Sequence, residues 1–188
     1  MRTRVVVTVV ALAAAIPGAS IAAAAGPPKT VTATLITRPA HTLAPGSKVS
    51  ASKLFGQRVF VDAKHGFALV DTGSAQYSAA TADGGKTWKT DSPALHLNAA
   101  QAPLAVVDIG AAGRKTVFAW GSGQVIDTTS DGGKHWYRAL FTQGIPVAVV
   151  KDLRGHLVAF VDGSTTTSQY VSKDGGKTWH LDNTVGGS

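Results

Sequence analysis

The sequence predicts an all-β protein built from three copies of one four-stranded unit. The composition is poor in helix-forming residues: all eleven acidic residues are Asp, and Gly accounts for 21 of the 188 residues. After Pro28, few segments show the apolar period of about 3.6 residues that is typical of an amphipathic helix. Short runs rich in Val, Phe, Thr and Tyr alternate instead with Gly, Asp and Ser, a pattern that indicates strands joined by tight turns.

Residues 1–25 are predicted to be a secretory signal peptide. Met1–Arg4 is basic, Val5–Ala15 is almost entirely apolar, and small residues precede the expected cut after Ala25. The uninterrupted apolar run is shorter than a membrane span requires. We therefore expect an exported protein of bacterial type, secreted or in the cell envelope, with no membrane span after signal cleavage. The chain has no Cys, so packing alone has to hold the exported fold together.

A ten-residue turn recurs three times in the chain. It reads TADGGKTWKT from Thr81, TSDGGKHWYR from Thr129 and SKDGGKTWHL from Ser172, so the copies are 48 and 43 residues apart. Periods of this size are typical of solenoids, propellers and arrays. Three apolar segments separated by turns precede each copy, and a further one follows it. Each repeat is therefore predicted to be a four-stranded antiparallel meander, with the recurring turn between its third and fourth strands.

The recurring turn has a physical explanation. Its Asp is expected to accept hydrogen bonds from nearby backbone N–H groups, which fixes the turn. Its two Gly residues permit positive φ angles, where a side chain would clash. Its Trp opens the outgoing strand and offers a large apolar surface to a neighbouring unit.

These turns resemble the Asp-box of the bacterial neuraminidase repeat family, Ser/Thr-x-Asp-x-Gly-x-Thr-Trp. The second copy departs from the family pattern, because His135 stands where the family has Thr. The matching residues are Thr81, Asp83, Gly85, Thr87 and Trp88 in the first copy, Thr129, Asp131, Gly133 and Trp136 in the second, and Ser172, Asp174, Gly176, Thr178 and Trp179 in the third.

The resemblance covers Lys53 to Asn183 and implies that the three units are β-propeller blades. Similar repeats occur in sialidases, xyloglucan hydrolases, sortilin-type receptors and photosystem assembly factors of the Ycf48 type. Because the functions of these proteins differ widely, the fold does not choose among them.

The predicted organisation is a signal peptide over 1–25, an N-terminal arm over 26–53 and a three-blade propeller-like domain over 54–188. The arm offers one added strand, over Thr30–Thr37. Propellers usually have roughly four to eight blades, so three blades would leave two apolar blade faces open. Three arrangements resolve this: a homodimer that closes a six-bladed ring, an arm that covers one face, or a compact bundle that is not a propeller.

No catalytic residue, metal site or cofactor is predicted. The resemblance to sialidases implies an Arg cluster, a Tyr nucleophile, a Glu and an Asp acid/base, but the chain contains no Glu. The six His residues lack the spacing of metal ligands. A pair of Asp carboxylates remains an alternative, because glycosidases use two carboxylates. The candidates for such a pair outside the boxes are Asp62, Asp71, Asp108, Asp127, Asp152 and Asp162. Most of them recur at equivalent positions in successive repeats, which favours structural roles.

A basic binding face is predicted at the boxes. Lys86, Lys134 and Lys177 occupy the same position in the three copies, and such a face suits an anionic glycan or a membrane surface. Nucleic acid is not expected as a partner, because the protein is exported and three of its four Trp lie in boxes. We therefore predict an exported, non-catalytic module that binds a protein or glycan. The alternative is a small or degenerate glycoside hydrolase that uses an Asp pair.

Overall fold

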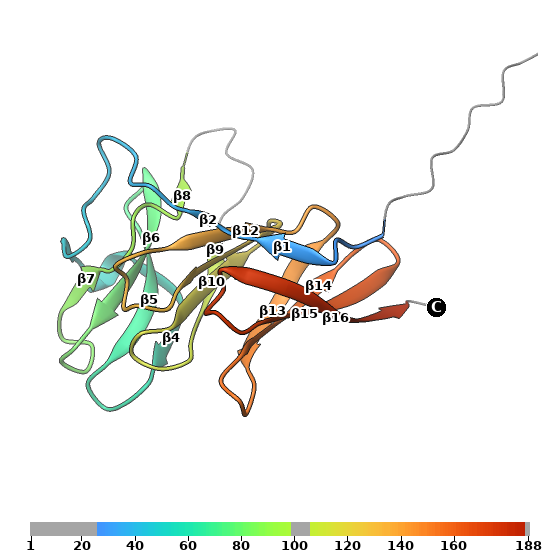
Figure 1. The fold of residues 1–188 in the computed structure, drawn as a ribbon. Coiled ribbons are helices and arrows are strands. Elements are labelled where there is room, and N and C mark those ends of the chain that lie inside the picture. The colour runs from blue at the N-terminus through green and yellow to red at the C-terminus, as the bar shows by residue number, and fades with distance from the viewer. Residues whose placement is uncertain (1–25, 99–105, 187–188) are drawn as a thin grey trace, which may run out of the picture.

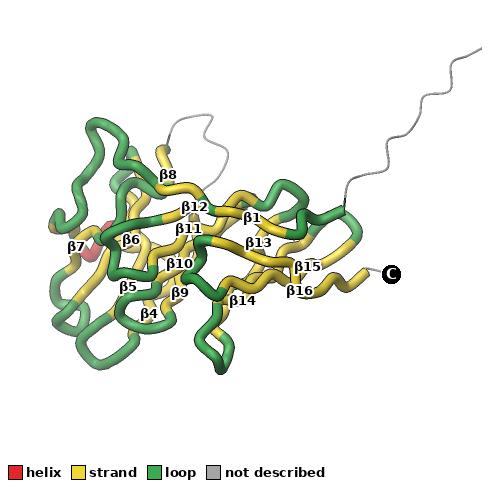
Figure 2. Tube along the Cα trace, in the orientation of Figure 1, coloured by secondary structure: helices red, strands yellow, loops and turns green. Residues whose placement is uncertain are grey.

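The computed structural model describes residues 26–98 and 106–186. The predicted signal peptide, residues 1–25, lies outside the described residues. The described part is all-β, with three antiparallel sheets that stand side by side as blades, and this confirms the predicted fold class (Figures 1 and 2). It contains no helix able to span a bilayer.

Each blade contains four consecutive strands in the predicted meander. Blade 1 consists of β4 (Leu54–Phe60), β5 (Gly66–Asp71), β6 (Ala75–Thr81) and β7 (Trp88–Thr90). Blade 2 consists of β9 (Val106–Ala111), β10 (Val117–Gly121), β11 (Val125–Thr129) and β12 (Tyr137–Leu140). Blade 3 consists of β13 (Ile145–Lys151), β14 (Leu157–Asp162), β15 (Thr166–Ser172) and β16 (Thr178–Gly186). A 3-10 turn (Ala51–Lys53) precedes blade 1, and the short β8 (His96–Leu97) pairs with β6.

The N-terminal arm adds a fifth strand to the outer edge of every blade. β1 (Thr30–Thr32) pairs with β16, β2 (Thr34–Leu35) pairs with β12, and β3 (Lys48–Val49) pairs with β7. The arm therefore crosses the blades in the reverse of their order along the chain, as the blue trace in Figure 1 shows. The sequence predicted one added strand, whereas the structure has three short ones, because each blade leaves the edge of its fourth strand open to pairing.

The core lies between the blades, and the box Trp residues are central to it. Trp136 is buried between blades 1 and 2, in a cluster that includes Phe67 and Leu69 of β5. Trp179 is fully buried between blades 2 and 3, together with Phe118 and Trp120 of β10. Each of these indoles thus packs toward the preceding blade, as expected for a side chain that joins neighbouring units.

Trp88 of blade 1 has no preceding blade among the described residues, and the arm takes that place. Leu43 and Val49 pack against the buried cluster that contains Trp88 and Tyr77. The Leu43 N–H also donates to the Tyr77 hydroxyl at 3.1 Å. Of the three arrangements considered for the open faces, the structure therefore shows the arm covering one face, that of blade 1.

Candidate functional site

The box turns are held by their own side chains. In the first box, the Thr81 hydroxyl donates to Asp83 Oδ1 at 2.8 Å and accepts from the Gly85 N–H at 2.9 Å. The Thr87 N–H donates to Asp83 Oδ1 at 2.9 Å and its hydroxyl to Oδ2 at 2.6 Å. Hydrogen bonds from Thr87 and Thr81 lower the pKa of Asp83 to about 2. The third box repeats the pattern through Ser172, Asp174, Gly176 and Thr178.

The second box keeps the same turn although His135 replaces Thr. The His135 N–H donates to Asp131 Oδ1 at 3.0 Å, and its Nδ1 lies 2.7 Å from Oδ2. Burial alone would raise the pKa of Asp131, but the bonds from His135 and Thr129 outweigh it and lower that pKa to about 2. The imidazole therefore supplies the contact that the resemblance assigns to a Thr hydroxyl.

The glycines of the boxes adopt the expected positive φ angles, and one of them also permits close packing between blades. Gly176 has a φ of 93°, and a Cβ placed there would lie 2.2 Å from the Thr128 hydroxyl. Because that distance is far inside van der Waals contact, only Gly lets the third box approach blade 2 so closely.

The three box lysines are all exposed. Lys177 is partly engaged, because its Nζ lies 5.1 Å from the centroid of the Tyr137 ring in blade 2. Lys86 and Lys134 are exposed at the corresponding positions of the other two boxes. The binding role of this face stays a prediction.

Most of the Asp residues considered for a catalytic pair hold turns. Asp62 and Asp152 each accept two backbone N–H groups in the first hairpin turn of their blade, together with an imidazole contact from His65 or His156. The other candidates lie apart from one another. Asp71 accepts a hydrogen bond from the Gly73 N–H, and Asp162 accepts one from the Thr167 hydroxyl. Asp127 accepts from Arg138, and Asp108 lies in β9 opposite Trp120. Within residues 26–98 and 106–186, no three potential metal ligands come together.

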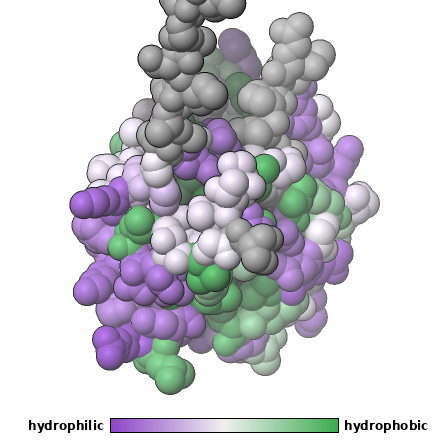
Figure 3. Space-filling model, turned by 90° about the vertical axis from the view of Figure 1, so that its right-hand side faces the viewer, coloured by the Kyte–Doolittle hydropathy of each residue, from purple (hydrophilic) through white to green (hydrophobic). Residues whose placement is uncertain are grey.

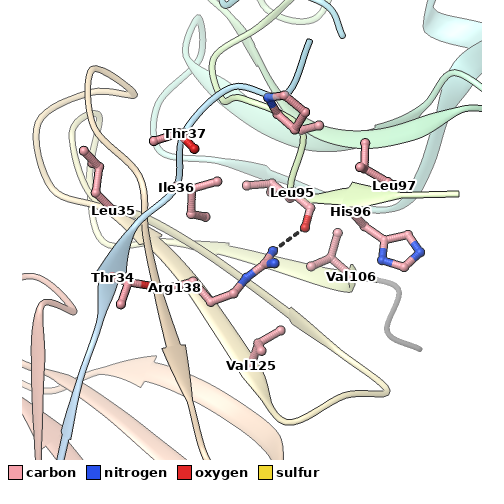
Figure 4. Close-up of a pocket in the computed structure, with 12 residues that line it drawn as sticks. Thr34, Leu35, Ile36, Thr37, Leu95, His96, Leu97, Val106, Val125 and Arg138 are labelled. Atoms are coloured by element: carbon pink, nitrogen blue, oxygen red, sulfur yellow. Dashed lines mark hydrogen bonds between the residues drawn. The ribbon is translucent and has the colours of Figure 1, made fainter. Parts of the chain in front are cut away.

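A cavity of about 440 Å³ opens where the arm crosses between blades 1 and 2 (Figure 4). The arm forms one wall, the segment after β7 forms a second, and blade 2 forms the third. Most of the lining is apolar, and Figure 4 shows Arg138 of β12 reaching into the cavity toward the Leu95 carbonyl. The apolar lining includes Leu35, Ile36, Leu95, Leu97, Val106 and Val125.

Arg138 is fixed in this cavity by a fully buried carboxylate. Its Nε donates to Asp127 Oδ1 at 2.7 Å and its Nη2 to Oδ2 at 2.6 Å. The Asp127 side chain is 0% exposed, whereas that of Arg138 is 36% exposed. Burial raises the pKa of the Asp127 carboxyl and the guanidinium opposes that rise, while the carboxylate raises the pKa of Arg138. Nη2 also donates to the Leu95 carbonyl, which ties blade 2 to the segment after blade 1.

Nη1 of Arg138 makes no hydrogen bond to any described residue, whereas Nε and Nη2 are both used. Burial and the nearby Arg138 charge lower the pKa of His96, and the Asp71 carboxylate opposes that effect. A carboxylate flanked by apolar groups would match this site, because guanidinium nitrogens bind carboxylates through charge-assisted hydrogen bonds.

The family model described as "Photosynthesis system II assembly factor YCF48" matches residues 47–187. The chain belongs to this family. Its match begins inside the arm, at the strand that pairs with β7, and includes all three boxes.

One solved structure similar to the chain is described as "YCF48 bound to D1 peptide". The sequences are 21% identical, and the match has a TM-score of 0.48. It covers 77% of this chain and 46% of the other, so the chain spans less than half the length of that member of the YCF48 family. No curated protein matches the chain.

The cavity at Arg138 was missed by reasoning from sequence. Arg138 and Asp127 are directly opposite in the register of β11 and β12, so an antiparallel pairing predicts their contact once that register is known. The wall formed by the arm carries no comparable signal, because its strands pair with partners that lie far away in the sequence.

A second carboxylate, that of the half-buried Asp91, provides a test of the packing between blades 1 and 2. Asp91 Oδ1 is buried and, like the nearby Ser78 hydroxyl, has no hydrogen-bond partner among the described residues. Its backbone carbonyl accepts from the Trp136 indole at 2.9 Å. Burial raises the pKa of Asp91 from its ordinary value near 3.8 to about 6.

Replacing Asp91 by Asn is expected to stabilise the protein at pH 7. Because the folded-state pKa is raised, Asp91 favours folding below pH 4, and that contribution is lost as the pH rises through 6. The Asn variant has no such ionisation, so its free energy of unfolding should exceed that of the wild type by up to about 3 kcal/mol at pH 7. The difference should shrink as the pH falls to 4. Urea unfolding at several pH values measures it, and a pH-independent difference would contradict the prediction.

Proposed function

We propose that this protein is a non-catalytic module that binds an extended segment of a partner protein, and that it works outside the cytoplasm after export. The binding site is the cavity between the arm and blades 1 and 2. The observation that carries the proposal is Nη1 of Arg138, which Asp127 holds inside an apolar cavity and which makes no hydrogen bond to the residues that the structure describes.

The chemistry of the cavity specifies the kind of segment. Leu35 and Leu97 at its walls are 51% and 44% exposed and offer contacts for apolar side chains. Arg138 Nη1 offers hydrogen bonds to a carboxylate, from an acidic side chain or from a chain terminus. Small-molecule and peptide sites commonly combine an apolar lining with a few oriented polar groups.

Two further observations favour a protein ligand over the alternatives. The YCF48 family is described as an assembly factor, and assembling a complex requires contact with its protein components. The capping bonds of Asp62 and Asp152 occupy carboxylates that a hydrolase would need to be free. A glycan ligand remains the second candidate, supported by the exposed Lys86 and Lys134.

Binding can be tested with synthetic peptides. The probe is a set of fluorescent peptides rich in apolar residues, each made with a free C-terminal carboxylate, with a C-terminal amide, and with an internal Asp or Asn. Fluorescence anisotropy is expected to show binding of members with a carboxylate. Loss of the carboxylate should weaken binding about tenfold or more, as expected for a hydrogen bond to a charged group.

Two variants test whether the peptides bind in the cavity. Leu97→Asp introduces a negative charge into the lining and should abolish binding, whereas Leu140→Asp is the matched control. Leu140 is 50% exposed and does not line the cavity. Equal effects of the two variants, or equal binding of acids and amides, would refute the site. Binding of acidic polysaccharides that is lost on replacing Lys86 and Lys134 would favour a glycan instead.

A further inference from the structure

The turns at one end of the three blades lie together. In every blade this end holds the turn between the first and second strands and the box turn between the third and fourth. The Gly84 N–H donates to the Lys64 carbonyl at 2.9 Å, and the Gly132 N–H donates to the Lys115 carbonyl at 3.0 Å, so these boxes pack against the first turn of their own blade. We call this surface the box end, and its turns are residues 61–65, 82–87, 112–116, 130–136, 152–156 and 173–177.

Contacts between blades make the box end one continuous surface. Arg114 Nε of blade 2 donates to Asp62 Oδ2 of blade 1 at 2.9 Å. A Cβ placed on Gly175 of the third box would lie 2.4 Å from the Cβ of Ser130 in the second, so these two boxes touch. In Figure 1 the first turn of blade 3, drawn in orange, projects from the lower edge of the molecule.

The box end has more basic than acidic side chains. Its five Asp residues all accept hydrogen bonds from backbone N–H groups of their own turns. Of its Lys and Arg residues, Arg114 alone forms an ion pair within residues 26–98 and 106–186. The basic residues of these turns, all of them exposed, are Lys64, Lys86, Arg114, Lys115, Lys134, Arg154, Lys173 and Lys177.

The opposite end of the blades has no such basic group in its hairpin turns. Residues 72–74, 122–124 and 163–165 include neither Lys nor Arg, and Asp71 and Asp162 border two of these turns. The Arg138 cavity lies toward this end, because Val106 and Val125 in its lining are the first residues of β9 and β11. A partner on the box end would therefore leave the cavity accessible.

An apolar side chain projects from the box end. Leu153 lies in the first turn of blade 3 and is 107% exposed, so the described residues bury none of it. The exposed Lys151 and Arg154 lie close to it in the chain. Figure 3, which shares its vertical axis with Figure 1, shows hydrophobic surface projecting at the lower edge of the molecule beside strongly hydrophilic surface. An apolar tip among basic groups is suited to a partner that is both anionic and apolar.

We propose that the box end binds the surface of a membrane that contains anionic phospholipids, and that Leu153 enters this membrane between the headgroups. Anionic headgroups attract clusters of Lys and Arg, and an apolar side chain beside them gains free energy by leaving water. An acidic glycan would engage the basic groups but not an exposed Leu, whereas a membrane engages both. The proposal is independent of peptide binding at Arg138, and either can fail without the other.

Vesicle binding tests the proposal. The full chain, expressed with its own N-terminal segment and purified after export, is sedimented with vesicles of phosphatidylcholine alone or of phosphatidylcholine mixed with phosphatidylglycerol. Binding to the anionic vesicles is expected to be about tenfold tighter or more, and to weaken as the salt concentration rises from about 0.1 M to about 1 M. Equal binding to the two kinds of vesicle, or binding to neither, would overturn the proposal.

Variants that remove charge locate the binding surface. Lys134→Gln combined with Lys173→Gln should weaken binding to the anionic vesicles about tenfold, because each Lys near a charged membrane contributes to the attraction. Lys29→Gln combined with Lys53→Gln is the matched control, since it removes the same charge outside the turns of the box end. Equal losses for the two double variants would show that net charge alone attracts the protein, and would refute the proposed face.

Leu153 distinguishes a membrane from an acidic polymer. Leu153→Ser should weaken vesicle binding severalfold, whereas Leu140→Ser, at an exposed position in β12, should not. The four Trp residues of the chain are buried. The indole introduced by Leu153→Trp should therefore be quenched selectively by vesicles with brominated acyl chains. If Leu153→Ser binds normally and this quenching is absent, the face recognises anionic polymers in general and the membrane proposal is wrong.

Discussion

Replacing Arg138 by Ala is expected to lower the free energy of unfolding by about 3–5 kcal/mol. The Asp127 side chain is 0% exposed, and Arg138 supplies both of its side-chain hydrogen bonds. Removing the guanidinium leaves a buried carboxylate without a partner, which costs much more than an exposed ion pair is worth. The same change removes the bond from Nη2 to the Leu95 carbonyl.

Urea unfolding, followed by Trp fluorescence, measures this effect. Arg154→Ala is the matched control, because Arg154 is exposed and its replacement should change stability by less than about 0.5 kcal/mol. The double variant Arg138→Ala, Asp127→Asn should recover part of the loss, since the buried group is then neutral. A loss for Arg138→Ala no greater than that of the control would show that the buried pair does not stabilise the fold.

Deleting residues 26–49 is expected to abolish cooperative folding. The deletion removes β1, β2 and β3 and uncovers the apolar cluster of Trp88 and Tyr77 on blade 1. In the intact protein these two side chains are only 2% and 1% exposed. Uncovering large apolar side chains costs roughly 1.5–3 kcal/mol each. The sum is comparable with the whole stability of a typical domain, about 5–15 kcal/mol.

Rescue of the truncated chain by a separate arm peptide is the control for the deletion. A synthetic peptide of residues 26–49 should restore a cooperative unfolding transition to the truncated chain, monitored by Trp fluorescence. The same peptide with Leu43→Asp should not, because it places a charge in the apolar cluster. A truncated chain that unfolds as cooperatively as the intact protein would mean that the blades do not depend on the arm.

The box turns show how much a sequence can predict when the interactions are local. Thr81, Asp83 and Thr87 lie within seven residues of one another, and their hydrogen bonds form within the turn. The three meanders are also local, because each strand pairs with the next along the chain. These elements were predicted correctly, since their residue types and spacing depend little on the rest of the molecule.

The cavity depends on contacts that no local pattern contains. Thr34 pairs with Arg138, and Thr30 with His180, so the arm finds its place only after the blades present their outer edges. In the sequence, nothing distinguishes Asp127 from the other candidate carboxylates. Its contact with Arg138 follows only from the register of β11 and β12. Its burial depends on how the blades and the arm stack around it.

The sequence by itself thus determined the strands, the three box turns and the role of the box Trp residues as apolar contacts between units. These follow from short-range hydrogen bonds and from the alternation of apolar residues, which act over a few residues. The tertiary structure alone decided the path of the arm, the covered face of blade 1 and the position of Arg138. Each of these depends on which edges and faces remain free after stacking, and their energies are spread over many residues that are distant in the chain.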